Sequence, residues 1–380
     1  MRRLGQGCAR QSAERAVCGA FVLLIAACGE VAESDSEAVR LEPDASVVSA
    51  PSEMSDVVLL AGGTACVIDS YWYRVVCTDP DGGSFSFGSE GEGPGEFAAP
   101  SSILRGAAGT IGVTDLQLQR LSVFSGSGEF LSSTAGIPSG FLGDGARGMN
   151  GTLIGRHPKL DADGDLSFVS AEVDAASGRV VWERAFPEEA DVVDCSTPTP
   201  GPRRRQLGGG YHAEGGGLLF VPCYGEFLVW YADRDAATPD AIVRSTYVER
   251  YPTDEDVAAQ LQWLNSLPAG GFRPSFDEEE IRATPKVWYG SRLVDDQRRF
   301  WAVSHWNAFD EVIPALSHID MYRLTDAGPQ YALTVQVADK VVGMDVFGNT
   351  LAVLVERDTG GVVAERRVDW YDVATVTAGR

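Results

Sequence analysis

The chain has 380 residues and a formal net charge of -23, from 54 acidic residues against 31 lysines and arginines. This balance excludes a protein that binds nucleic acid through its folded surface, because no basic patch is left to neutralise phosphates. It also argues against a folded face that binds anionic lipid headgroups.

The N-terminus has the pattern of an export signal. Arg2 and Arg3 precede an apolar run over residues 16–27. At about twelve residues this run is too short for a spanning helix, which needs roughly 20. It ends in Ile25-Ala26-Ala27-Cys28, which resembles a bacterial lipobox. The pattern predicts a lipoprotein signal peptide over residues 1–27 and acylation of Cys28.

The segment after the signal is acidic and has little to bury. Residues 29–56 contain eight acidic side chains and one basic side chain, Arg40. Such a composition predicts a disordered tether over residues 28–56, followed by a folded domain over residues 57–380. We expect the protein at the bacterial cell envelope, held at a membrane by lipid alone. Gly29 stands where an Asp often retains lipoproteins at the inner membrane, which favours the outer membrane or the cell surface.

The cysteine count agrees with export. Four cysteines remain outside the signal and the lipidation site: Cys66, Cys77, Cys195 and Cys223. If residues 66–69 and 74–77 form a hairpin, Cys66 lies directly opposite Cys77, close enough for a disulfide. Cys195 would then pair with Cys223 by elimination. Four buried thiols are the alternative, although an oxidising compartment favours disulfides.

A repeated motif dominates the rest of the chain. A small residue or turn is followed by an apolar run and then a polar residue. Six copies occur, at residues 64–69, 109–115, 151–156, 217–223, 299–304 and 349–356. Most copies are followed by a short run in which apolar and polar residues alternate, a pattern that suits an outer strand. The repeat predicts an all-β fold, a six-bladed β-propeller of four-stranded antiparallel blades.

Two spacings between copies are longer than one blade requires. The first contains residues 187–210, rich in Pro, Gly and Arg, which we interpret as an inserted loop. The second contains a helical insertion at about residues 253–282. There Thr253 and Asp256 suit a helix N-cap, and Val257, Leu261 and Leu264 follow at helical spacing. We expect these helices across one face of the disc.

Closing the ring needs a strand from elsewhere. Few residues follow Tyr371, too few for a regular last outer strand. Residues 45–50 or 57–60 are therefore expected to pair with the final blade.

One stretch resembles a known repeat. Residues 91–97 (GEGPGEF), Pro100, Ile103, residues 111–115 (IGVTD) and residues 120–124 (RLSVF) resemble an NHL-type propeller repeat. The whole layout, a lipobox followed by such blades, resembles the six-bladed propeller lipoproteins of bacteria. This resemblance implies a fold and no particular activity.

Candidate functional residues follow from position alone. The chain has no nucleophile elbow, no HExxH helix, no CxxC pair and no Walker loop. We therefore predict no catalytic residue, metal ligand or cofactor. In a propeller, the residues that close the second strand of each blade open onto the face where ligands usually bind. Besides Asp69 and Asp115, which also suit ordinary strand ends, these candidates are Arg156, His157, Tyr224, His305, Trp306, Glu356 and Arg357.

Arg, His, Tyr and Trp around one funnel would suit a carboxylate or a sugar. The favoured function is a binding or protein-interaction module at the envelope, whose partner is an unknown small ligand or an envelope protein. We expect the protein to be a monomer. A metal-dependent, lactonase-like hydrolase or a lyase is the second class, separable by metal analysis. A structural partner of an outer-membrane assembly, docking through the helical insertion, is the third.

Overall fold

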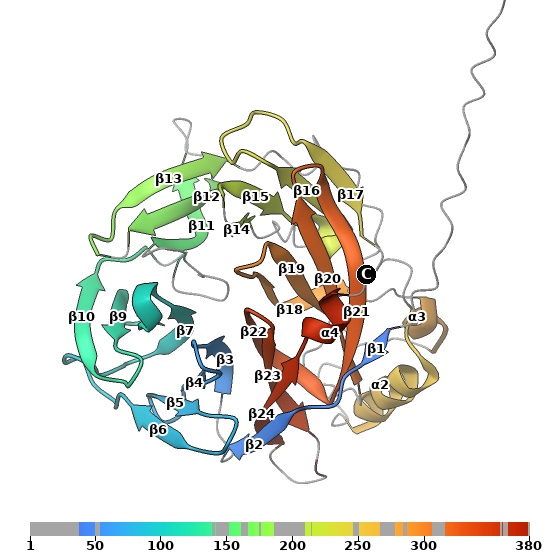
Figure 1. Cartoon of the computed structure of the whole chain (residues 1–380), viewed down its shortest axis with the longest axis horizontal. Helices are drawn as coiled ribbons and strands as arrows, with labels where there is room; N and C mark the ends of the chain where they lie inside the picture. The colour runs from blue at the N-terminus through green and yellow to red at the C-terminus, as the bar shows by residue number, and fades with distance from the viewer. Residues whose placement is uncertain are drawn as a thin grey trace, which may run out of the picture. The chain divides into compact units, whose positions relative to one another are not determined.

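The structure of the chain is a computed structural model. The residues described are 38–49, 54–138, 141, 152–160, 166–174, 176–185, 210–213, 215–245, 251–266, 278–283, 287–305, 316–357, 359 and 364–378. Contacts divide the chain into Met1–Asp35 and Ser36–Arg380, and every described residue belongs to the second unit. Its strands form six sheets that follow one another around a central axis (Figure 1). The predicted six-bladed β-propeller is confirmed.

We number the blades 1 to 6 along the chain. Blade 1 consists of β3 (Met54–Leu59), β4 (Ala65–Asp69), β5 (Arg74–Thr78) and β6 (Ser84–Phe87). Blade 2 consists of β7 (Pro100–Arg105), β8 (Ile111–Asp115), β9 (Arg120–Phe124) and β10 (Phe130–Ala135). Blade 3 contains β11 (Thr152–Leu160), β12 (Leu166–Asp174) and β13 (Val180–Ala185). Blade 4 consists of β14 (Gly210–Ala213), β15 (Gly217–Phe220), β16 (Phe227–Tyr231) and β17 (Ala241–Arg244). Blade 5 contains β18 (Val287–Val294), β19 (Arg299–His305), β20 (Leu316–Thr325) and β21 (Gly328–Ala338). Blade 6 contains β22 (Lys340–Phe347), β23 (Thr350–Arg357) and β24 (Glu365–Asp372).

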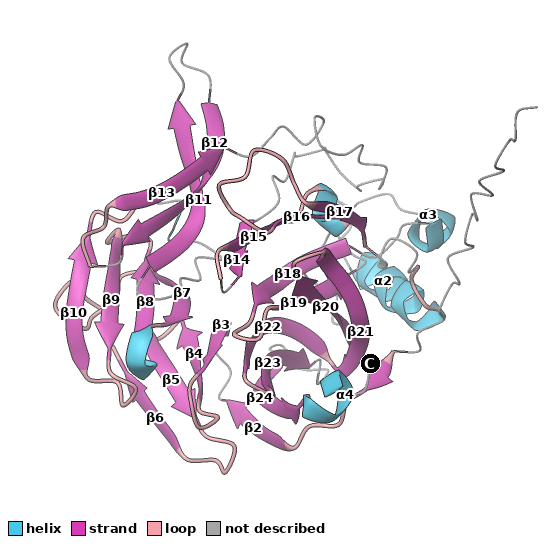
Figure 2. Cartoon of the chain, turned by 45° about the horizontal axis from the view of Figure 1, so that its top comes forward, coloured by secondary structure: helices cyan, strands magenta, loops and turns pink. Residues whose placement is uncertain are grey.

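The repeated motif correctly located the second strand in five blades, where it overlaps β4, β8, β15, β19 and β23. Blade 3 departs from the four-stranded pattern, with three strands in its described part. Its β11 and β12 are each nine residues long. Figure 2 shows this hairpin extending beyond the neighbouring blades.

The ring is closed by the segment just before blade 1. Strand β2 (Ala45–Ser49) pairs antiparallel with β24 and supplies the outer strand of blade 6. Strand β1 (Val39–Arg40) pairs in parallel with β21 and adds a fifth strand to blade 5. Closure by residues 45–49 confirms one of the two predicted segments, whereas residues 57–59 lie in the inner strand of blade 1. The predicted tether over residues 28–56 is therefore too long, because backbone pairing already begins at Val39.

Apolar clusters join each blade to the next. Val57 and Leu59 of blade 1, for example, pack with Leu354 and Trp370 of blade 6. Comparable clusters join blades 1 and 2, 2 and 3, 3 and 4, 4 and 5, and 5 and 6. A single blade has two apolar faces that it cannot bury alone, so the stacking of neighbours stabilises the ring.

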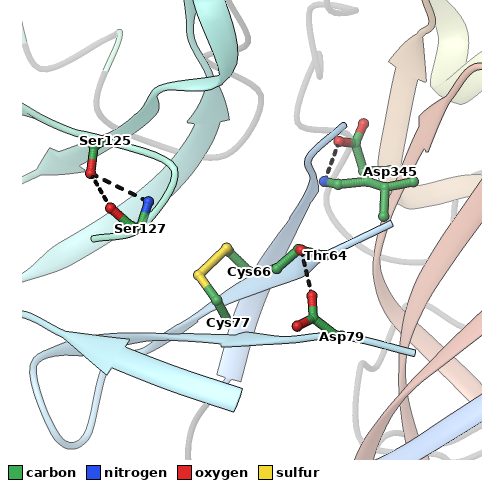
Figure 3. Close-up of a disulfide and its surroundings, with 8 residues drawn as sticks. Thr64, Cys66, Cys77, Asp79, Ser125, Ser127 and Asp345 are labelled. Atoms are coloured by element: carbon green, nitrogen blue, oxygen red, sulfur yellow. Dashed lines mark hydrogen bonds between the residues drawn. A yellow bond between two sulfur atoms is a disulfide. The ribbon is translucent and has the colours of Figure 1, made fainter. Parts of the chain in front are cut away.

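The first predicted disulfide is confirmed. Cys66 on β4 lies directly opposite Cys77 on β5, and the two are bonded within the buried core of blades 1 and 2 (Figure 3). Beside it, the Thr64 hydroxyl donates to Asp79 at 2.5 Å and joins the two strands again. Cys223 is also disulfide-bonded, and Cys195 lies outside the described residues, so its pairing with Cys223 stays a prediction.

The helical insertion forms where the capping pattern predicts it. Helix α2 (Asp254–Ser266) begins after Thr253, whose hydroxyl accepts from the Asp256 amide at 3.2 Å. The Asp256 carboxylate in turn accepts from the Thr253 amide at 2.9 Å, which is a capping box. Helix α3 (Glu278–Ala283) packs against α2 through Ile281. Both lie outside the ring beside β1 (Figure 1), so the expected position across one face is wrong.

The described residues also include three short helical segments: η1 (Ala107–Gly109), η3 (Cys223–Gly225) and α4 (Ala374–Ala378). Among the described residues, no helix is both long and apolar enough to cross a membrane.

Candidate functional site

The second strands of the blades end at a common face. In a complete blade the four strands alternate in direction, so the second strand ends at the face that also carries the connections between blades. We call this the upper face and define it by the strand ends Asp69, Asp115 and Arg357. Arg357 ends β23, as predicted, and His305 ends β19 in the adjacent blade.

Three predicted positions differ from the expectation. Arg156 and His157 lie within β11, which continues to Leu160, so they do not close a strand. Tyr224 lies in η3, after β15 has ended at Phe220. Trp306 lies outside the described residues, as do the side chains of Arg156, His157, Tyr224 and His305. Their place in a funnel stays a prediction.

Acidic residues at the upper face anchor turns. Asp69 is fully buried and accepts from the Arg74 guanidinium at 3.0 Å, across the β4–β5 turn. Asp115 is fully buried and accepts from three backbone amides, those of Ala98, Ala99 and Leu118. Both Asp residues therefore have the ordinary role of a strand-end residue.

Glu356 occupies the corresponding position in blade 6. It lies opposite Arg366 in the β23–β24 ladder and accepts from its Nε and Nη2 at 2.9 and 2.6 Å. Both nitrogens donate to the same carboxylate oxygen, Oε2, and these charge-assisted hydrogen bonds fix both side chains. Glu356 thus holds the end of the hairpin, and its predicted role as a ligand contact is not supported by this geometry.

Arg357 is arranged differently. Its Nε donates to both carboxylate oxygens of Asp339, at 3.2 and 3.3 Å, and half of its side chain is exposed. Within the described part of the chain, neither Nη atom of Arg357 has a hydrogen-bond partner. The outer edge of the guanidinium can bind a carboxylate through two parallel hydrogen bonds, and no described residue occupies it.

Buried charges hold Asp339 in place. Arg367 donates from Nη2 to Asp339 at 2.8 Å and from Nε to Asp369 at 2.8 Å. Asp369 is fully buried and also accepts from the Ser46 hydroxyl at 2.6 Å. Burial acts against the charge of Arg367, but the hydrogen bonds and charges of Asp369 and Asp339 outweigh it and raise its pKa above the usual value. The chain Ser46–Asp369–Arg367–Asp339 thereby positions Arg357.

Asp339 and Arg367 were missed by sequence reasoning. Asp339 lies in the one-residue link between β21 and β22, and Arg367 is the third residue of β24. The only signal was the density of charge in residues 364–369 (AERRVD), where four of six side chains are charged.

A second group of polar side chains lies between blades 3 and 4. Burial lowers the pKa of His212 to about 4, so the imidazole is neutral at pH 7. The Trp182 ring meets the imidazole edge-on at 5.0 Å, and Arg234 lies over Trp182 and binds Glu172 at 2.6 Å. The Nε2 atom of His212 is buried without a hydrogen-bond partner. It is closed to solvent, which makes it a weaker candidate than Arg357.

The described residues contain no group of three or more His, Cys, Asp or Glu side chains that could hold a metal ion. The polar turn at residues 161–165, where alternate Asp residues occur, lies outside the described part. The metal-dependent enzyme thus remains an alternative without a specific observation in its favour.

No protein-family model and no curated protein sequence matches the chain. Among solved structures, a member of the DUF4221 family from Bacteroides vulgatus is 13% identical, with a TM-score of 0.49, over 89% of this chain and 99% of the other. A luciferin-regenerating enzyme is 12% identical, with a TM-score of 0.43, over 84% and 92%. An inactive variant of virginiamycin B lyase from Staphylococcus aureus is 12% identical, with a TM-score of 0.35, over 85% and 82%. Such distant matches concern the fold alone and support no particular ligand or reaction.

Proposed function

We propose that this chain is exported, anchored to the bacterial cell envelope by lipid on Cys28, and binds a carboxylate-bearing ligand at the upper face of its propeller. The observation that carries the binding proposal is the guanidinium of Arg357, which Asp339 positions through Nε while no described residue engages either Nη atom. The lipid anchor and the ligand are separate proposals, and each has its own test.

The export proposal draws on the signal pattern and on the disulfide. Ile25-Ala26-Ala27-Cys28 follows an apolar run of signal-peptide length. The Cys66–Cys77 disulfide is typical of a protein that folds in an oxidising compartment. Only residues 29–38 separate Cys28 from β1, and a chain of that length reaches about 35 Å at most. The propeller would therefore be kept close to the membrane.

Replacing Cys28 should release the protein from the membrane. In Cys28→Ser the acylated thiol is missing, so we expect the protein to leave the membrane fraction and to lose the mass of its acyl chains. Cys18→Ser is the matched control, because Cys18 lies inside the apolar run and should be removed with the signal. Membrane fractionation and intact-mass spectrometry provide the measurement. Acyl chains retained by Cys28→Ser would refute the anchor.

The carboxylate proposal follows from the geometry around Arg357. Asp339 engages Nε, and no described residue engages Nη1 or Nη2, the edge of the guanidinium that planar carboxylates bind. Arg367, which is itself bound to the buried Asp369, fixes Asp339 through a charge-assisted hydrogen bond, so little side-chain freedom is left to lose on binding. His305, predicted to face the same funnel, ends the second strand of the adjacent blade.

The binding test uses acetate, succinate and galacturonate, with phosphate as a comparison, measured by isothermal titration calorimetry. For the carboxylate that binds the wild type, Arg357→Gln should weaken affinity about 10- to 100-fold, since a charge-assisted bidentate contact is worth about 1.5–3 kcal/mol. Arg357→Lys should fail to restore it, because lysine has no fork.

Arg298→Gln is the control variant. Arg298 lies in the β18–β19 turn, at the opposite face, and its two Nη atoms contact Asp326. It should bind as the wild type does. Unchanged binding in Arg357→Gln, or no binding of any carboxylate by the wild type, would overturn the proposal.

A further inference from the structure

Large apolar side chains are exposed on the turns of blades 1 and 2 at the upper face. Tyr71 and Trp72, in the β4–β5 turn, are 62% and 58% exposed, and Leu116, directly after β8, is 50% exposed. The two aromatic rings lie edge to face with centroids 5.1 Å apart. Trp and Tyr are the residue types that contribute most at protein interfaces.

The aromatic turn is held in a fixed conformation. The buried carboxylate of Asp69 accepts from the Trp72 amide at 3.3 Å and from Arg74 Nε at 3.0 Å. Tyr73 has a φ of 52°, a left-handed conformation that non-glycine residues adopt rarely. These contacts fix the backbone that carries Tyr71 and Trp72, so the turn itself holds both side chains in their exposed positions.

The loop over residues 88–99 connects the two turns into one surface. At Gly88, whose φ is 86°, a Cβ would lie 3.3 Å from the Tyr73 carbonyl and 2.3 Å from the Phe97 ring, so the loop begins against the first turn. It ends against the second, where the Leu116 amide donates to the Ala99 carbonyl at 3.0 Å. Arg120 also donates to the carbonyl of Glu92 at 2.8 Å.

The charges that this surface offers to a partner are negative. Glu90 and Glu92 are exposed on the loop. The neighbouring cations are already engaged, Arg74 with Asp69 and Arg120 with backbone carbonyls of the loop. The whole chain has a net charge of -23, so its field also attracts cations and repels anionic membranes.

We propose that Tyr71, Trp72, Leu116, Glu90 and Glu92 form a docking surface for a cationic polypeptide segment that carries apolar side chains. Tyr71, Trp72 and Leu116 supply apolar contact area, and the two glutamates attract and orient lysines or arginines of the partner. This surface is separate from Arg357 and would serve a protein partner at the envelope, independently of a small ligand.

The test uses a synthetic 15-residue peptide with alternating Lys and Leu, a matched peptide with Glu in place of Lys, and vesicles of phosphatidylserine and phosphatidylcholine. The full chain with Cys28→Ser should bind the Lys peptide and neither the Glu peptide nor the vesicles. Tyr71→Ser with Trp72→Ser should weaken peptide binding about tenfold, as expected for loss of aromatic anchors. Glu90→Gln with Glu92→Gln should weaken it less, and mainly at low salt.

Val181→Ser with Ile242→Ser is the control. Val181 and Ile242 are 57% and 45% exposed on the outer strands β13 and β17. This variant should bind the Lys peptide as the parent chain does, and all variants should keep the parent melting temperature. Equal binding by every variant would show non-specific attraction to an acidic protein and overturn the proposal, as would binding to the vesicles. Arg357→Gln should leave peptide binding unchanged, so this proposal and the carboxylate site can fail separately.

Discussion

A chain that begins at Glu53 should melt at least about 10 °C below a chain that begins at Ser36. The shorter chain lacks β1 and β2 and keeps β3, so blade 6 loses its outer strand while blade 1 stays complete. The loss includes the β2–β24 ladder, the packing of Ala45 and Val47 against the cluster of blades 1 and 6, and the Ser46–Asp369 hydrogen bond. At about 1 kcal/mol for each hydrogen bond, these losses lower the free energy of unfolding by at least about 5 kcal/mol. Each 1 kcal/mol lowers the melting temperature of a domain of this size by about 2 °C.

Thermal unfolding followed by circular dichroism measures this effect. A chain that begins at Ser36 is the matched control, because it lacks residues 1–35 but keeps both closing strands. It should melt with the same midpoint as the full-length chain with Cys28→Ser. Equal midpoints for the chains beginning at Ser36 and Glu53 would mean that residues 38–49 do not close the ring.

The second large loss of thermal stability is expected on replacement of Asp295, which lies in the turn between β18 and β19. Its carboxylate accepts from Arg299 Nε at 2.5 Å, from the Arg299 and Gln297 amides, and from Trp301 Nε1 at 2.8 Å. Both members of the ion pair are almost fully buried. Asp295→Ala leaves a buried guanidinium and a buried indole N–H without their acceptor. Removal of one partner from such a pair costs about 3–5 kcal/mol, so the melting temperature should fall by roughly 8 °C.

Asp296→Ala is the matched control for this variant. Asp296 is the next residue and is exposed. Within the described part of the chain, its carboxylate accepts only from the Gly348 amide. An exposed contact of this kind contributes little, so the melting temperature should fall by about 1–2 °C. Similar losses in Asp295→Ala and Asp296→Ala would contradict the role of the buried pair.

Contacts within a blade could be predicted because they are local. The Cys66–Cys77 pairing followed from a hairpin register, in which residues that face each other across a short turn are fixed by the turn length. The second strands followed from a motif that recurs once per blade. The capping box at Thr253 and Asp256 also needed only four consecutive residues. Each of these features depends on side chains that are close in sequence.

Contacts between blades could not be predicted in this way. Arg357 was a candidate from its strand-end position, but nothing near it in sequence showed that the carboxylate of Asp339 would engage its Nε. The acidic composition of residues 29–56 predicted a tether, whereas residues 39–40 and 45–49 pair with β21 and β24, hundreds of residues later. Composition describes what a segment would do alone and does not include the partner strand that it can pair with.

The sequence alone determined the number of blades, the second strands of five of them, the first disulfide and the need for a closing strand. These features follow from the two-residue alternation of strands and from short turns, which operate over a few neighbouring residues. The tertiary structure decided which strand closes the ring, which carboxylate positions Arg357, and that the turns of blades 1 and 2 share one exposed surface. Those features depend on how separate sheets pack around the axis, and that packing brings together residues with no relation in sequence.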